Sequence, residues 1–90
     1  MANYVVTVNS DLSVSPDPVQ IHGGDTVTWE GSEDFAVHMP QGYNNPHVQQ
    51  SNGKWQGSSD PFPGRADKYR VQYTVTRGGQ VHDPDVEVLP

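Results

Sequence analysis

The stretch that decides the fold runs from residue 16 to residue 39 and reads Pro-Asp-Pro-Val-Gln-Ile-His-Gly-Gly-Asp-Thr-Val-Thr-Trp-Glu-Gly-Ser-Glu-Asp-Phe-Ala-Val-His-Met. Two short segments with apolar side chains at every second position flank its Gly-Gly-Asp turn. Alternation with a period of two is typical of strands that bury one face. We therefore predict a hairpin of strands 19–22 and 26–30, with Trp29 pointing into the core.

The remainder of the chain continues this pattern in short pieces separated by prolines and glycines. Strand-like segments are expected at 4–8, 12–15, 35–39, 69–75 and 86–88. Between residues 40 and 67 there is little strand pattern, which predicts a long loop with room for one short strand around 54–56. The whole chain is thus predicted to be a single all-β domain, residues 1–90, a Greek-key β-sandwich of six to eight short strands.

Composition excludes several classes of function. The 90 residues carry a formal net charge of −6, with five lysines and arginines, so we expect no nucleic-acid partner and no anionic membrane surface. Apolar runs fall far short of the roughly 20 residues of a membrane-spanning helix. The chain is expected to be cytoplasmic if Met1 is the native start, and otherwise a mature periplasmic or secreted domain.

Several short motifs resemble cupredoxins, the plastocyanin- and azurin-type β-sandwiches that carry blue copper. They are Gly24-Asp25-Thr26-Val27-Thr28-Trp29, then His38 on the next strand, then the alternating strand from Tyr69 to Val75 and the terminal Val86-Glu87-Val88. The resemblance spans most of the chain and implies a cupredoxin-like sandwich. It also implies that His38 matches the first copper ligand, with a Cys, a His and a Met expected in the last loop.

The chain contains no cysteine, so the thiolate that makes copper blue is missing. Blue-copper electron transfer is therefore rejected, and no cofactor is expected. Counting back from Val88 by the resemblance, the position of the family's Met falls on His82. This leaves one alternative, a non-blue Cu(II) or Zn site at His38 and His82, joined by His47 or His22. The favoured interpretation is that His38 packs beneath the loops and has a structural role.

The long segment carries three aromatic side chains, Tyr43, Trp55 and Phe62. If exposed, they could stack on a sugar ring or anchor a protein partner; if buried, they would hold the segment over the sandwich. The amides around them suit a neutral polar ligand as well as a solvated loop. The leading hypothesis is a metal-free binding module for an unknown protein or small polar ligand, with Tyr43, Trp55 and Phe62 as contact residues.

Enzymatic activity is not expected, because no nucleophile-elbow motif is present and no two acids are placed across a cleft. Asp83, Asp85 and Glu87 share one face of the last strand. Their spacing spreads the carboxylates along a strand and does not gather them around a cation. We expect this strand to be a solvated edge whose charges discourage further strand pairing.

Overall fold

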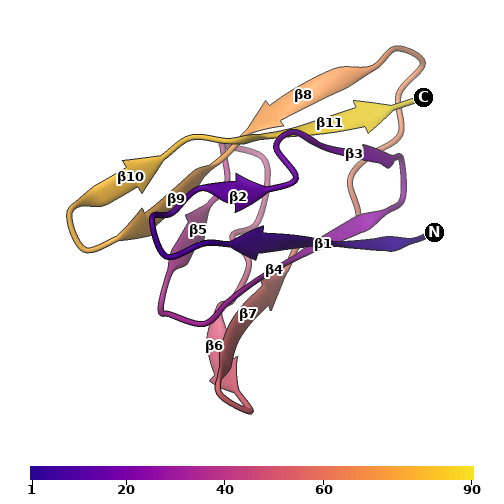
Figure 1. Ribbon diagram of the computed structural model, residues 1–90. Coiled ribbons are helices and arrows are strands. Elements are labelled where there is room, and N and C mark those ends of the chain that lie inside the picture. The colour runs from indigo at the N-terminus through magenta and orange to yellow at the C-terminus, as the bar shows by residue number, and fades with distance from the viewer.

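The computed structural model describes residues 1–90 as eleven short strands without a helix (Figure 1). No helix is therefore long and apolar enough to cross a membrane. The strands are β1 (Asn3–Val8), β2 (Val14–Ser15), β3 (Val19–His22), β4 (Thr26–Gly31), β5 (Ala36–His38), β6 (Gln49–Ser51), β7 (Lys54–Ser58), β8 (Tyr69–Gln72), β9 (Thr74–Arg77), β10 (Gln80–His82) and β11 (Asp85–Leu89). The all-β prediction is confirmed, while the more specific Greek-key and cupredoxin-like description stays a prediction.

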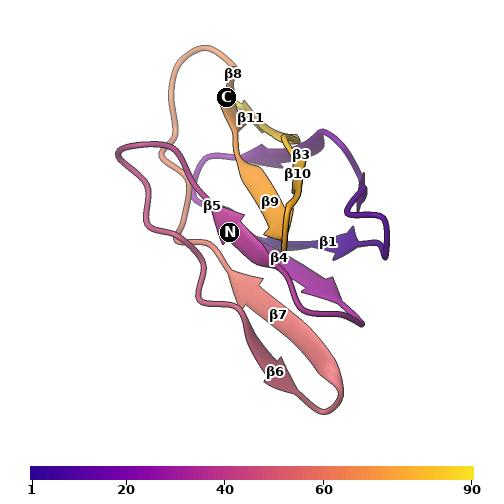
Figure 2. The ribbon, with the colours of Figure 1, turned by 90° about the vertical axis from the view of Figure 1, so that its left-hand side faces the viewer.

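One layer is a five-stranded mixed sheet in the order β2-β1-β4-β7-β6. β4 lies at its centre, parallel to β1 and antiparallel to β7. Every second side chain of β4 is buried, including Val27 and Trp29, and the residues between them face solvent in part. Figure 2 shows the β6–β7 end of this sheet extending beyond the rest of the sandwich.

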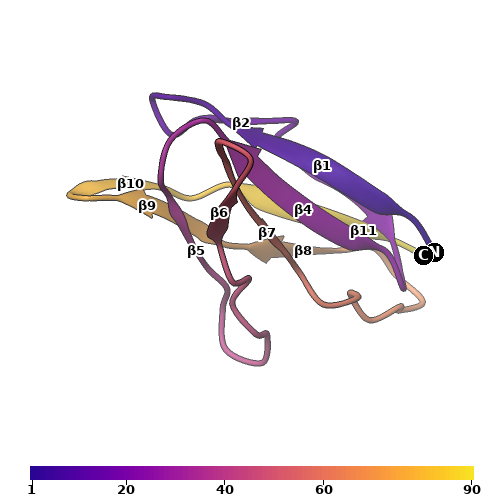
Figure 3. The ribbon, with the colours of Figure 1, turned by 90° about the horizontal axis from the view of Figure 1, so that it is seen from below.

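The opposite layer consists of two three-stranded sheets, β3-β11-β8 and β10-β9-β5. They share two chain segments, because residues 69–77 supply β8 and then β9, and residues 80–89 supply β10 and then β11. At the junction the Tyr73 N–H donates to the Pro84 carbonyl at 3.0 Å. Figure 3 shows these strands crossing beneath β1 and β4, with both chain termini at the same end of the molecule.

The core lies between the layers and is built mostly from valines around a few large side chains. Trp29 is fully buried, as the alternating pattern predicted, and so is Tyr73 at 1 % exposure. The buried hydrophobic residues are Val6, Val8, Leu12, Val14, Val19, Ile21, Val27, Trp29, Phe35, Val37, Phe62, Val71, Tyr73, Val75, Val86 and Val88.

The predicted hairpin at the Gly-Gly-Asp turn is wrong. β3 pairs with β11 in one layer and β4 pairs with β1 and β7 in the other, so the turn is an arch that crosses the sandwich. Asp25 stabilises the arch, because its carboxylate accepts the N–H of His22 at 2.9 Å and the N–H of Ala2 at 2.7 Å. In the arch Asp25 is buried at 5 % exposure.

The predicted long loop at residues 40–67 contains a hairpin, β6–β7, that extends the five-stranded sheet. Its turn is Asn52-Gly53, where both residues have positive φ, 52° and 78°. Asn-Gly favours this turn because the two residues tolerate left-handed backbone angles. β6, the division of residues 69–77 into β8 and β9, and the additional strand β10 raise the strand number to eleven, above the six to eight expected.

The predicted edge position of the last strand is also wrong, because β11 lies at the centre of its sheet, between β3 and β8. Glu87 is buried to 7 % exposure and accepts hydrogen bonds from Gln20 at 2.6 Å and Arg70 at 3.3 Å. These bonds, that of Gln20 first, hold the pKa of Glu87 below its usual value. The carboxylate is tolerated in a central strand because neighbouring strands supply its partners.

Candidate functional site

A cavity of about 350 Å³ lies between two segments of the region that the sequence marked as a loop. Residues 39–44 form one wall and residues 59–65 the other. Figure 2 shows both segments along the same side of the sandwich. The cavity is lined by Met39, Gln41, Gly42, Tyr43, Asn44, Ser59, Asp60, Pro61, Phe62, Pro63 and Arg65.

The wall at residues 59–65 is fixed to the arch by main-chain bonds. The Gly24 N–H donates to the Phe62 carbonyl at 2.8 Å, and the Phe62 N–H donates to the Asp25 carbonyl at 3.0 Å. A Cβ on Gly23 would lie 2.4 Å from the Cα of Gly64, so the two backbones touch. The Gly-Gly-Asp motif therefore positions this wall as well as the crossing between layers.

The wall at residues 39–44 is held by amide side chains. Asn45 accepts the Met39 N–H at 2.6 Å, and Asn44 donates to the carboxylate of Asp60 on the other wall at 2.8 Å. Two of the amides that suited a polar ligand in the sequence therefore hold the protein's own loops. Of the two bonds, the one between Asn44 and Asp60 joins the two walls.

The cavity has an aromatic floor. The rings of Tyr43 and Phe62 pack in a tilted arrangement with their centroids 5.8 Å apart. Phe62 is buried at 2 % exposure, whereas Tyr43 is half-buried. Two other cavities, of about 360 and 520 Å³, are lined mainly by polar residues of the five-stranded sheet and its end, so the aromatic floor distinguishes this one.

Arg65 lies at the rim of this cavity, stacked on Tyr69. Its guanidinium carbon is 4.1 Å from the centroid of the Tyr69 ring, and the Tyr69 hydroxyl donates to the Pro63 carbonyl. Burial raises the pKa of Tyr69, and the neighbouring Tyr43 adds to this effect more than Arg65 opposes it. Tyr69 therefore stays a neutral phenol that supports the cation.

The three aromatic residues predicted as contacts have different roles. Tyr43 and Phe62 meet at the cavity, but Phe62 belongs to the core and offers no free face. Trp55 lies on β7, opposite Gly31 of β4 and Gln50 of β6, and is partly buried against the core. Of the three, only Tyr43 is both at the cavity and accessible.

The histidines of the alternative metal site do not converge. His38 pairs with Thr74 across β5 and β9, whereas His82 pairs with Val75, the neighbour of Thr74. Paired residues share a face and neighbours in a strand alternate, so the two imidazoles point to opposite faces of the sheet. His47 lies apart, beside a cavity on the five-stranded sheet. No group of three or more histidine, aspartate or glutamate side chains could hold a metal ion.

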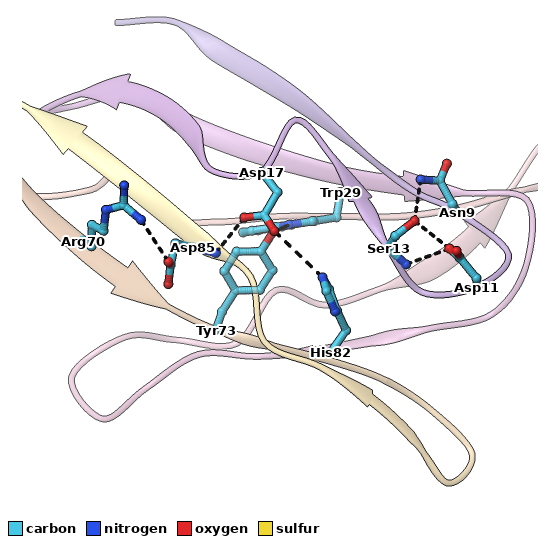
Figure 4. A network of polar contacts seen from close by, with 9 residues as sticks. All are labelled: Asn9, Asp11, Ser13, Asp17, Trp29, Arg70, Tyr73, His82 and Asp85. Atoms are coloured by element: carbon cyan, nitrogen blue, oxygen red, sulfur yellow. Dashed lines mark hydrogen bonds and ion pairs between the residues drawn. The ribbon is translucent and has the colours of Figure 1, made fainter.

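The contacts of the two histidines are structural ones. The prediction that His38 packs beneath the loops is wrong, because the residue is exposed at the end of β5. Its Nε2 is 3.2 Å from the Thr76 hydroxyl on the neighbouring strand. His82 Nε2 lies 3.9 Å from the carboxylate of Asp17, which also accepts the Asp85 N–H at 3.2 Å (Figure 4). Asp17 thus ties the proline-flanked segment before β3 to the last two strands. The copper-like donor set implied by the cupredoxin resemblance does not fit these positions.

Sequence analysis missed Arg65 and Tyr69 as site residues. Tyr69 begins the alternating strand predicted from Tyr69 to Val75, but its ring is only half-buried at the start of β8. Arg65 had no local signal beyond its charge. The stacking of the two depends on the course of residues 59–68, which is fixed by contacts with the distant arch.

The chain matches no protein-family model and no curated relative. A similar solved structure is the cysteine protease inhibitor EhICP2 from Entamoeba histolytica. The alignment covers 99 % of this chain and 95 % of that chain, with a TM-score of 0.56 and 10 % sequence identity. At this identity the match shows a shared fold, an all-β sandwich, over nearly the full length of both chains.

Proposed function

We propose that this chain is a protein-binding module whose contact surface is the cavity between residues 39–44 and 59–65. The observation that carries the proposal is a preformed cavity with an aromatic floor, a half-buried tyrosine and a stacked arginine at its rim. Tyrosine and arginine are enriched among the residues that dominate binding energy at protein interfaces. The cavity walls are braced by the protein's own bonds, so little ordering is needed on binding.

No metal takes part in this proposal, because His38 and His82 point to opposite faces of one sheet. The cupredoxin-like signature then describes the scaffold: Asp25 and Trp29 hold the arch and the core. The fold shared with the inhibitor EhICP2 supports a role in protein recognition. The protease partner in its name is a property of EhICP2 itself.

Partner capture tests the proposal. Immobilised wild-type protein and the variant Tyr43→Ala/Arg65→Ala are exposed to the same extract, and retained proteins are quantified by mass spectrometry. We expect a partner retained by the wild type and lost by the double variant. Val81→Ala is the control, because Val81 is 63 % exposed on β10, which contributes no residue to the cavity. A partner retained equally by the double variant would refute this surface.

A more specific candidate is inhibition of a cysteine protease, favoured by the full-length structural match to EhICP2. A panel of cysteine proteases assayed with fluorogenic peptides checks it. Inhibition that saturates at a one-to-one ratio would support the candidate. No inhibition at micromolar protein would reject it and leave the broader proposal standing.

A further inference from the structure

Arg65 is the one arginine of this chain whose guanidinium makes no hydrogen bond or ion pair within the protein. Arg70 pairs with two carboxylates of β11, and Arg77 donates to two backbone carbonyls. Arg65 instead contacts the face of Tyr69, an interaction that leaves its N–H donors free. Arg65 is thus a positioned cation without an anionic partner in a chain of formal net charge −6.

The position of Arg65 is fixed by a chain of contacts. The Tyr69 hydroxyl donates to the carbonyl of Pro63, which closes the turn that carries Arg65, and the preceding Phe62 is bonded to the arch. Stacking on an aromatic ring orients the planar guanidinium without using its donors. The donors are therefore preorganised for an external acceptor.

The nearest acid on the cavity walls does not neutralise Arg65. Asp60 lines the same cavity, but its carboxylate accepts a hydrogen bond from Asn44, at 2.8 Å, across the two walls. The floor beside the arginine is apolar, formed by Met39, Tyr43 and Phe62. An incoming group thus meets the free donors of Arg65 at the rim and the apolar side chains of Met39 and Tyr43, while the carboxylate of Asp60 in the same lining is engaged by Asn44.

Resting on the proposed function, we infer that the occupant of this cavity is a peptide segment of a partner protein in which an aspartate or glutamate side chain is followed by an apolar side chain. The carboxylate would take two N–H donors of Arg65 in the fork arrangement that suits guanidinium, and the apolar side chain would cover Tyr43 and Met39. A cavity of about 350 Å³ accommodates one large apolar side chain with part of its backbone. The donors at the rim are the N–H groups of the Arg65 side chain. Because proteins hold a C-terminal carboxylate mainly with backbone amides, an aspartate or glutamate side chain fits this rim better.

Titration of peptides into isotope-labelled protein, followed by NMR, tests this inference. The first probe is an acetylated and amidated hexapeptide, Gly-Ser-Glu-Leu-Ser-Gly. Its matched controls replace Glu-Leu by Gln-Leu, Glu-Ser or Lys-Leu, and a further peptide lacks Glu and ends in a free C-terminal Leu. We expect the Glu-Leu peptide to shift amide resonances at residues 39–45 and 59–66, with binding about tenfold weaker for Gln-Leu.

The same titration is repeated on Arg65→Gln and on Lys68→Gln, which removes a nearby exposed cation as a matched control. We expect Arg65→Gln to abolish the preference for Glu over Gln, and Lys68→Gln to keep it. Equal responses to Glu-Leu and Gln-Leu, no response at millimolar peptide, or a response only to the free C-terminal Leu would each overturn the inference. Partner capture that depends on Tyr43 would persist in those cases, so the proposed function can survive this failure.

Discussion

The indole N–H of Trp29 donates to the hydroxyl of Tyr73 at 2.9 Å, and the two rings meet edge to face with centroids 5.0 Å apart. Trp29 lies on β4 in one layer, and Tyr73 lies between β8 and β9 in the other. Figure 4 shows the pair between the two layers. Both side chains are buried, so this bond satisfies the indole N–H where solvent cannot reach it. Burial raises the pKa of Tyr73, and the phenol stays neutral.

Tyr73→Phe keeps the ring but leaves the buried indole N–H without an acceptor. We expect a loss of about 1–3 kcal/mol in the free energy of unfolding, the cost of an unsatisfied buried donor. Urea unfolding followed by tryptophan fluorescence measures it. Tyr4→Phe is the control, because Tyr4 is only partly buried at the margin of the core. Equal stability of the two variants would contradict the proposed bond.

Asp25 predicts a pH dependence of stability. The N–H groups of His22 and Ala2 lower the pKa of its carboxyl, so the folded state holds the ionised form more strongly than the unfolded state does. The stabilisation is present above the unfolded pKa, about 3.9, and is lost as pH falls through the lower folded value. Thermal unfolding from pH 6 to pH 2.5 should show a smaller decline in Asp25→Asn than in the wild type. Asp67→Asn, on the exposed part of the connection to β8, should behave like the wild type.

Gly23→Ala tests the contact between the arch and the cavity wall. The new Cβ would lie 2.4 Å from the Cα of Gly64, where only backbone can move. We expect a loss of about 1–3 kcal/mol in the free energy of unfolding and NMR shifts at residues 59–66. Gly79→Ala is the matched control, since nothing lies within 4 Å of its added Cβ. A Gly23→Ala variant as stable as Gly79→Ala would show that the two backbones do not touch.

The hairpin turn gives an independent prediction. Gly53 has φ of +78°, and an alanine there is strained by about 1–2 kcal/mol. We expect Gly53→Ala to speed hydrogen exchange in β6 and β7 while the amides of β11 stay protected. Uniformly faster exchange would mean that the hairpin unfolds together with the whole sandwich. Unchanged exchange would contradict the turn itself.

The placement of the histidines predicts their response to metal. Zn(II) added to the protein should shift the ring resonances of His38 and His82 independently, because the two side chains occupy opposite faces. His38→Ala should therefore leave the response of His82 unchanged. A loss of the His82 response in that variant would restore the shared site that the sequence allowed.

Much of the fold could be predicted from local patterns, because alternation fixes which side chains share a face. Trp29 in the core and the shared inner face of Val71, Tyr73 and Val75 follow from that alone. The Asn52-Gly53 turn was also visible in the sequence, and its strong turn preference was overlooked among the prolines and glycines of the long segment. Partner strands could not be predicted, since a strand's own pattern does not identify its neighbour.

The sequence by itself determined an all-β chain with a thin, valine-rich core around Trp29, and the missing cysteine excluded a blue-copper site. Only the tertiary structure decided that the Gly-Gly-Asp turn crosses between layers, that His38 and His82 diverge, and that Arg65 stacks on Tyr69 beside Tyr43. The physical reason is the different range of the interactions along the chain. Periodicity and turn preference act over a few residues, whereas sheet membership and the convergence of side chains depend on contacts between segments far apart in the chain.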